Sequence, residues 1–324
     1  MRRVLPSLLA ATLLWAQGPQ LQYVPKADPS LPRYQPGTAL EEILEATGTD
    51  GMTDVWEEWK QAFSAFHPQA KYRVNHTLTK TAIEAMMQGK SQLIYLAREM
   101  SIDEIQAFER KFGYTPTKII ACYDAFIVFV NGGNPLKDIS MEQLDALLST
   151  TRKVGHPTSI DTWGDLDVRG ALARRPINVY IRAEGTATRA VLKDLLLLKG
   201  TFKAGLLDRP DFPSIADAVV TDAAGIGIAG LAHWYSRNRT LAVAPPQSRS
   251  ALMPSQDNVT SGRYPLARTY YFYLNRPPGK SLPAPIQEFL QFLLSLDGQQ
   301  AVAVASLYPV PAEIIQANRR RIRN

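Results

Sequence analysis

The sequence predicts an α/β fold with two lobes. Short apolar runs typical of buried strands alternate along the chain with segments that have the 3.6-residue periodicity of helices. Two apolar runs, 119–130 and 264–275, are longer than the rest, and each leads to an asparagine shortly before a proline. Strands of this length can carry the chain out of one lobe and back again. We therefore expect a cleft between the lobes, where the turns from strand to helix gather.

The elements of the first half follow from their apolar patterns, taken in order. Strands are expected at 44–47, 72–76 and 93–96, where the runs are short and apolar or alternate with polar residues. Helices are expected at 54–63, 81–87 and 102–112, where apolar residues recur every three or four positions. After the long strand, glycines and a proline at 131–135 form a turn.

The same patterns alternate in the second half. Helices are expected at 141–148 and 189–196, and strands at 177–181 and 225–230. The long strand 264–275 brings the chain back, and helices at 286–296 and 298–306 follow. We therefore expect residues 39–128 and 262–324 to form the first lobe and residues 129–261 to form the second. The arginines of residues 319–323 are expected to be a solvated end.

The amino terminus has the pattern of an export signal. Arg2 and Arg3 precede an apolar core at 4–16, which is too short for a transmembrane span. We expect residues 1–16 to be a signal peptide cut near Gln17, and the polar, proline-rich residues 17–38 to be a linker. No cysteine near the cut offers a lipid attachment point, so the mature protein is expected to be periplasmic or secreted.

Composition excludes several classes of function. The chain of 324 residues has a formal charge of +6, which suits an anionic ligand. Its single cysteine, Cys122, lies in an apolar run and cannot form an internal disulfide. The four histidines lack metal-ligand spacing, and no nucleophile motif is present. Basic residues are not interleaved with aromatic ones, so we expect no metal, cofactor, catalysis or nucleic acid.

Three turns rich in threonine or glycine, at 48–52, 78–81 and 182–188, each lead from a strand into a helix. The first turn of a helix has unpaired N–H groups and a partial positive charge, which together favour an oxyanion. Arg182 can add a bidentate, charge-assisted contact. The alternative is ordinary capping, in which Thr186 or Thr188 caps the helix and Arg182 pairs with Glu184.

In order and spacing, these motifs resemble those of the phosphate-binding proteins of bacterial ABC uptake systems. The first turn resembles that family's Gly-Ser-x-Thr loop, residues 79–81 fall at its serine-rich turn, and residues 182–188 resemble its Arg-x-x-Gly-Ser-Gly-Thr motif. Residues 97–100 and 124–128 resemble a Ser-Arg-x-Met turn and the hinge strand Asp-Ala-x-Ala-Val. The resemblance covers roughly residues 44–311 and implies the two-lobed type II periplasmic binding protein fold, with the ligand cleft between the lobes.

The resemblance also implies a function. The protein is expected to capture inorganic phosphate by hinge closure and deliver it to an ABC permease, as a monomer that transforms nothing chemically. Backbone N–H groups of Gly51 and Met52, the Thr79 hydroxyl and Arg182, oriented by Glu184, are implied as contacts. The full set of implied ligand-binding residues is Thr49, Asp50, Gly51, Met52, Thr79, Lys80, Thr81, Arg98, Arg182, Glu184, Thr186, Ala187 and Thr188.

Departures from the family pattern leave the anion open. Arg98 stands where well-known relatives have an aspartate that accepts the proton of hydrogen phosphate and repels sulfate. A second arginine there should favour any oxyanion, unless Asp50 or Glu184 accepts the proton instead. The alternatives are a binder of another tetrahedral oxyanion such as sulfate, and a phosphate-sensing or scaffold protein with weak binding. A secreted phosphatase or other hydrolase is a third alternative.

Overall fold

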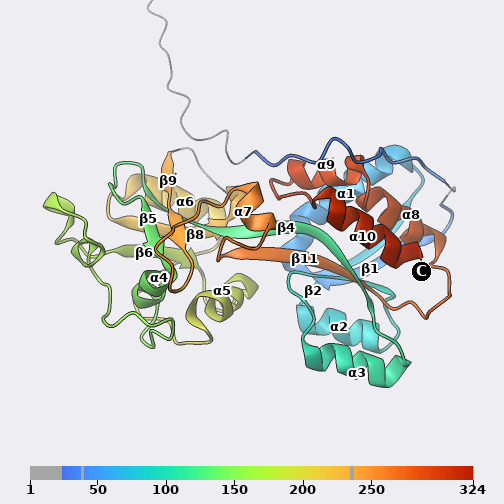
Figure 1. Ribbon diagram of the computed structural model, residues 1–324, viewed down its shortest axis with the longest axis horizontal. Helices are drawn as coiled ribbons and strands as arrows, with labels where there is room; N and C mark the ends of the chain where they lie inside the picture. The colour runs from blue at the N-terminus through green and yellow to red at the C-terminus, as the bar shows by residue number, and fades with distance from the viewer. Residues whose placement is uncertain (1–23, 38–39, 234–236, 324) are drawn as a thin grey trace, which may run out of the picture.

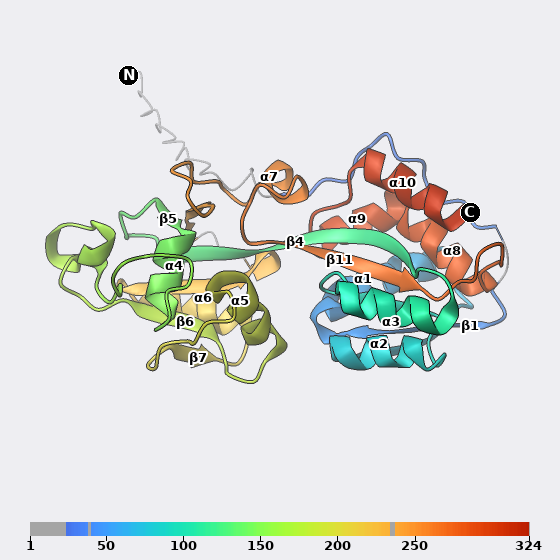
Figure 2. The same cartoon turned by 60° about the horizontal axis from the view of Figure 1, so that its bottom comes forward.

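The computed structural model describes residues 24–37, 40–233 and 237–323. They form two lobes that lie side by side along the long axis of the molecule (Figure 1). Two neighbouring antiparallel strands, β4 (Thr117–Asn131) and β11 (Ala267–Leu274), run between the lobes, and both views show them there (Figure 2). The two-lobed α/β prediction is therefore confirmed.

Strands of both lobes belong to one sheet. The first lobe contributes β1 (Ile43–Thr49), β2 (Lys71–Thr77) and β3 (Leu93–Leu96). The second contributes β6 (Asn178–Arg182), β7 (Leu207–Arg209), β8 (Gly225–Gly230) and β9 (Asn238–Thr240). Among the described residues the sheet has nine strands in the order β2-β1-β3-β11-β4-β8-β6-β7, with β9 paired to β4.

Helices cover both faces of the sheet in the first lobe (Figure 1). On one side lie α1 (Thr53–Phe66), α8 (Ala284–Leu293), α9 (Leu296–Val304) and α10 (Ala312–Arg323); on the other lie α2 (Thr79–Met87) and α3 (Ile102–Phe112). Because side chains alternate along a strand, β3 serves both faces. Its Leu93 and Tyr95 belong to the large core with α1, and its Ile94 and Leu96 belong to a smaller core with α2 and α3.

Aromatic side chains fill the core under α1. The Trp56 and Tyr95 rings stack with centroids 4.9 Å apart, and the Trp59 indole N–H donates to the Gly298 carbonyl at 3.1 Å. The Tyr95 ring lies so close to Gly48 on β1 that a Cβ there would come within 2.3 Å of it. Position 48 therefore has no room for a side chain.

The second lobe is built on β8, β6 and β7. Helix α6 (Phe212–Thr221) packs against β6 and β8, and α5 (Ala187–Leu197) packs against β6 and α4 (Met141–Leu148). A small parallel pair, β5 (Asp138–Ser140) with β10 (Ala242–Ala244), lies apart from the main sheet. The short helix α7 (Gln256–Thr260) lies beside the crossing strands.

The crossing between the lobes is visible in the strand pairing. Residues 117–125 of β4 pair with β11, and residues 126–130 pair with β8. On the returning segment, the Tyr264 hydroxyl donates to the Phe126 carbonyl at 3.0 Å. The change of partner therefore lies beside the lobe boundaries that we predicted after residues 128 and 261, and those boundaries stay a prediction.

The strands and helices predicted between residues 44 and 306 are all present, with ends that differ by a few residues. Helices α6, α7 and α10 and the short strands β5, β7, β9 and β10 were not predicted. Residues 319–323, predicted to be a solvated end, form the last part of α10, in which Arg320 and Arg321 are exposed. Ile315 and Asn318, earlier in this helix, are buried, and Asn318 Nδ2 donates to the Ile120 carbonyl at 2.8 Å.

The amino-terminal predictions fall partly outside the described residues. The predicted signal peptide, 1–16, and residues 17–23 of the predicted linker lie there. Residues 24–37 contain no helix or strand, but Leu31 and Tyr34 are buried in the first lobe. The Tyr34 hydroxyl donates to Glu288 at 2.6 Å, so this part of the predicted linker belongs to the fold. In the described ranges, no helix is long and apolar enough to cross a membrane.

Candidate anion-binding site

The predicted turns of both lobes face the crossing strands. Strand β3 runs antiparallel to β11, with Leu96 opposite Tyr271 and Leu93 opposite Leu274, so its carboxyl end lies toward the crossing. β1 and β2 are parallel to β3 and end at the same edge. In the second lobe Gly230 lies opposite Phe126, which turns the carboxyl ends of β8, β6 and β7 toward the crossing as well. Ligands of open α/β sheets bind outside such ends.

The first turn follows β1. Asp50–Met52 forms a short 3-10 turn that runs directly into α1, and no side-chain hydrogen bond caps either start. Thr49 and Met52 are buried, whereas Asp50 and Gly51 are exposed. A Cβ built on Gly51 would lie 4.0 Å from the Ala97 Cβ. The turn after β3 is therefore a direct neighbour of the turn after β1.

The second turn is the start of α2, whose capping residue Leu78 makes no side-chain cap. Thr79 is half-buried, whereas Lys80 and Thr81 are exposed, and Lys80 pairs with Glu84 at 3.8 Å. Serine or aspartate side chains cap α3, α4, α6, α7 and α9. No side-chain hydrogen bond caps the starts of α1 and α2, both at the candidate site, or that of α8, which begins among prolines. The first-turn amides of α1 and α2 can serve an anion.

Arg98 does not present a free positive charge. Its two terminal nitrogens donate to the two carboxylate oxygens of Glu104, each at 2.8 Å. Glu104 also accepts the Ser101 N–H and so completes the capping box of α3. The hydrogen bonds from Arg98 lower the pKa of Glu104 and raise that of Arg98. A carboxylate therefore compensates the positive charge of Arg98, and the prediction that this arginine favours any oxyanion stays a prediction.

Arg182 lies at the end of β6, and other residues of the second lobe hold its side chain. Its guanidinium donates to the Pro210 carbonyl and lies 5.5 Å from the centroid of the Phe212 ring. Its Nε is buried and has no hydrogen-bond partner among the described residues. Glu184 is exposed, and the described part of the chain shows no ion pair between it and Arg182. The expectation that Glu184 orients Arg182 is therefore wrong, since Pro210 and Phe212 hold the guanidinium.

Thr186 caps α5, as the capping alternative proposed. Its hydroxyl accepts the Arg189 N–H at 3.3 Å and donates to the Ala183 carbonyl at 2.8 Å. Ala187 begins the helix and half-buried Thr188 follows in its first turn. Arg189 was not among the predicted site residues; its guanidinium donates to the Arg182 carbonyl at 3.0 Å and fixes the end of β6. Arg189 lies three residues after Thr186, about one helical turn further along α5, and this spacing was the available signal.

A buried cluster that was not predicted from the sequence lies beside the first turn. Asp124 of β4 accepts hydrogen bonds from Arg268 and from the Tyr270 hydroxyl, both on β11, the second at 3.0 Å. The Tyr270 hydroxyl lies 3.2 Å from the Gly51 carbonyl oxygen. Polar residues facing each other on two otherwise apolar strands were the signal, but only the register shows that they meet.

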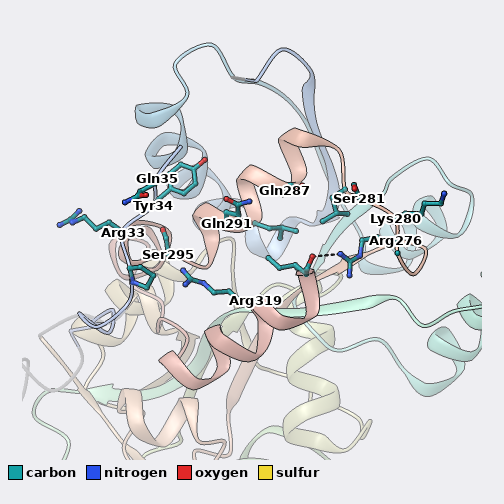
Figure 3. A pocket seen from close by; sticks show the side chains of 15 residues that line it. Arg33, Tyr34, Gln35, Arg276, Lys280, Ser281, Gln287, Gln291, Ser295 and Arg319 are labelled. Atoms are coloured by element: carbon teal, nitrogen blue, oxygen red, sulfur yellow. Dashed lines mark hydrogen bonds between the residues drawn. The ribbon is translucent and has the colours of Figure 1, made fainter. Parts of the chain in front are cut away.

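A cavity of about 760 Å³ lies elsewhere in the first lobe, between residues 32–35, α8 and α10 (Figure 3). Its lining includes four basic residues and no acidic one: Arg33, Arg276, Lys280 and Arg319. However, Arg276 donates to the carbonyls of Ile322 and Arg321, at 2.7 and 2.9 Å, and Arg319 donates to that of Leu294 at 2.7 Å. These are the last carbonyls of α10 and α8, so we interpret the two arginines as helix caps.

Comparison with known proteins agrees with this geometry. The sequence model of the PBP superfamily domain matches residues 32–297. The phosphate-binding protein PstS of Pseudomonas aeruginosa is 32% identical over 289 residues, which cover 89% of this chain and 90% of that protein. The chain belongs to the PstS family.

Solved structures share the fold of this PstS-family chain. An ABC-type phosphate transport receptor from Vibrio cholerae matches with a TM-score of 0.65 at 16% identity, covering 82% of this chain and 99% of the receptor. PstS from Borrelia burgdorferi matches with a TM-score of 0.64 at 17% identity, covering 84% of this chain and all of that one. The type II fold implied by the sequence resemblance is therefore confirmed.

Proposed function

We propose that this chain is an extracytoplasmic solute-binding protein that captures inorganic phosphate between its two lobes and delivers it to an ABC permease. One observation carries the proposal. The carboxyl ends of the parallel strands in both lobes, with the helix starts that follow them, face the same crossing. The relative from Pseudomonas aeruginosa is named a phosphate-binding protein, and the Vibrio cholerae structure is a phosphate transport receptor.

The proposed contacts come from both lobes. From the first lobe, the amides of Gly51 and Met52 and the hydroxyl and amide of Thr79 bind the anion. From the second, Arg182 binds it with the Ala187 amide and the Thr188 hydroxyl. Because the hydroxyl of Thr186 already caps α5, this residue contributes by fixing the helix start. Thr49, Asp50, Lys80, Thr81, Arg98 and Glu184 complete the proposed site as surrounding residues.

Binding closes the lobes in this proposal. An anion held by both lobes stabilises the closed arrangement relative to the open one, so phosphate shifts the equilibrium toward closure. β4 and β11 are the segments about which the lobes turn. The bound phosphate is released unchanged, and the protein acts as a monomer with neither cofactor nor nucleic acid. Small-angle scattering checks closure, because the radius of gyration should fall when phosphate is added.

Export precedes binding. We propose that residues 1–16 are a signal peptide and that the mature chain, beginning near Gln17, is periplasmic or secreted. The mass of the protein recovered from outside the cytoplasm tests this directly. A mass that includes residues 1–16 would contradict cleavage.

Calorimetric titration of the purified mature protein tests the function. We expect phosphate to bind, and sulfate to bind more weakly, because Glu104 compensates the positive charge of Arg98. Tighter binding of sulfate would overturn the phosphate assignment in favour of a sulfate-like oxyanion. No heat with either anion, together with a co-purifying membrane partner, would favour a sensing or scaffold protein instead.

A further inference from the structure

The buried cluster on the crossing strands reaches the first turn of the candidate site. Arg268 and Tyr270 lie on the part of β11 that pairs with β4 near Asp124. The side chains of Arg268 and Asp124 are only 12% and 4% exposed, and Tyr270 is 3% exposed. A charged pair removed from water in this way is held in one geometry by its hydrogen bonds. The Tyr270 hydroxyl therefore has a fixed position between the two crossing strands.

This hydroxyl lies 3.2 Å from the carbonyl oxygen of Gly51 and can donate to it. The Gly51 carbonyl and the Met52 N–H belong to one peptide unit. In a trans peptide the two groups lie in one plane and point in opposite directions. A contact that fixes the carbonyl therefore also fixes the direction of the Met52 N–H, which is one of the proposed anion donors.

The first turn needs such a contact. Gly51 has no side chain, and a Cβ built on it would find its nearest neighbour 3.8 Å away. No side-chain cap holds the Gly51 end of this peptide, and glycine has the widest backbone freedom of any residue. The hydrogen bond from the Tyr270 hydroxyl to the Gly51 carbonyl restricts that freedom.

Arg268 keeps the Tyr270 hydroxyl available to the Gly51 carbonyl. The hydroxyl has one proton, and the Asp124 carboxylate and the Gly51 carbonyl can both accept it. Arg268 donates to the same carboxylate oxygen and to the Tyr270 oxygen, which weakens the competition from Asp124. Burial raises the pKa of Tyr270, so the hydroxyl stays protonated at neutral pH.

We infer that Tyr270 is a positioning residue for phosphate: through the Gly51 carbonyl it directs the Met52 N–H toward the anion, while Asp124 and Arg268 hold it in place. The inference rests on the proposed function for its ligand. Because Tyr270 lies on a crossing strand, the contact also ties the first anion turn to the segment about which the lobes turn.

The test replaces Tyr270 by phenylalanine, which removes the hydroxyl and keeps the ring. The loss of one hydrogen bond predicts phosphate binding about fivefold weaker by calorimetry. The matched control is Tyr264→Phe, which removes another buried hydroxyl that donates to a carbonyl at the crossing, that of Phe126. We expect the control to bind phosphate as the unaltered protein does.

A second readout separates positioning from a general loss of stability. In the ¹⁵N-labelled protein, saturation with phosphate should shift the Met52 amide proton downfield, together with the amides of Thr79 and Ala187. In Tyr270→Phe the Met52 shift should shrink while the other two remain. Equal affinities and Met52 shifts in Tyr270→Phe and the unaltered protein would overturn the inference, as would equal weakening in both variants with an unchanged Met52 shift.

The ligand-free spectrum keeps the two proposals distinguishable. If the unaltered protein binds no phosphate, the proposed function fails, but the contact can still be tested. Tyr270→Phe should then move the Gly51 carbonyl and Met52 amide resonances of the free protein, and Tyr264→Phe should not. Resonances that stay in place would overturn the positioning role whatever the ligand.

Discussion

Arg98 and Glu104 form a bidentate ion pair, in which both nitrogen–oxygen distances are 2.8 Å. The pair lies at the turn where well-known relatives are expected to have an aspartate. A single cation there would favour every oxyanion alike. In this chain the cation comes with its own carboxylate, which also completes the capping box of α3. The local charge is therefore close to neutral, and this balance bears directly on which anion the protein selects.

Replacing Glu104 by glutamine tests the charge balance. Glutamine keeps the capping box but removes the negative charge, so Arg98 becomes free to attract any oxyanion. We expect sulfate affinity to rise about three- to tenfold and phosphate affinity to rise less, measured by calorimetry. The control is Glu109→Gln on the same helix, whose carboxylate accepts the Thr115 hydroxyl. Equal effects of the two substitutions would show that only net charge matters.

The same pair predicts a pH dependence of folding stability. Arg98 lowers the pKa of Glu104 below its ordinary value of 4.5. A lowered pKa in the folded state means that the contribution is complete above the unfolded value and is lost as pH falls through the folded value. The pair is partly exposed, so its contribution is at most about 1 kcal/mol. Urea unfolding of the unaltered protein and Glu104→Gln should therefore differ at pH 7 and converge toward pH 3.

Arg182 is predicted to carry much of the phosphate affinity. Arg182→Gln removes a charged donor from the second lobe, which should weaken phosphate binding about 10- to 150-fold in calorimetry. Arg209→Gln is the matched control, because Arg209 lies beside Arg182 on β7 and its guanidinium stacks 4.8 Å from the Tyr180 ring centroid. Loss of binding in both variants to the same extent would argue against a specific role for Arg182.

The buried pair at the crossing is predicted to matter for folding. Asp124→Asn leaves Arg268 buried without its carboxylate, which should lower the free energy of unfolding by about 3–5 kcal/mol. Glu45→Gln, which breaks the exposed pair with Arg73, should cost less than about 1 kcal/mol. Urea denaturation measures both. A loss in Asp124→Asn no greater than that in Glu45→Gln would contradict the buried role.

The fold could be predicted because its signals are local. The apolar periodicity of α1 and the two-sided apolar run of β3 are readable within a few residues. Helix α10 was missed because its arginines outweigh the few isoleucines that face β4, and only burial shows that face. The prediction that residues 24–37 belong to a linker was wrong for a similar reason, because Tyr34 donates to Glu288, which lies 254 residues further along the chain.

The site could be predicted only in part. The three turns are short motifs, and their placement at the carboxyl ends of the strands in each lobe follows from parallel pairing. The partners of Arg182 and of Asp124 are not local. Arg182 is held by Pro210, and Asp124 meets Arg268 across 144 residues of sequence. Neither contact leaves a pattern in a single sequence, so the buried Asp124–Arg268 pair and the Tyr270 contact emerge only from the strand register.

A crystal structure of the mature protein grown with phosphate tests the central claim most directly. We predict tetrahedral density between the lobes, with oxygens about 2.7–3.2 Å from the Met52 N–H, the Thr79 hydroxyl and the Arg182 guanidinium. Phosphate found only in the cavity near Arg276 and Arg319, or no density between the lobes at saturating phosphate, would contradict it.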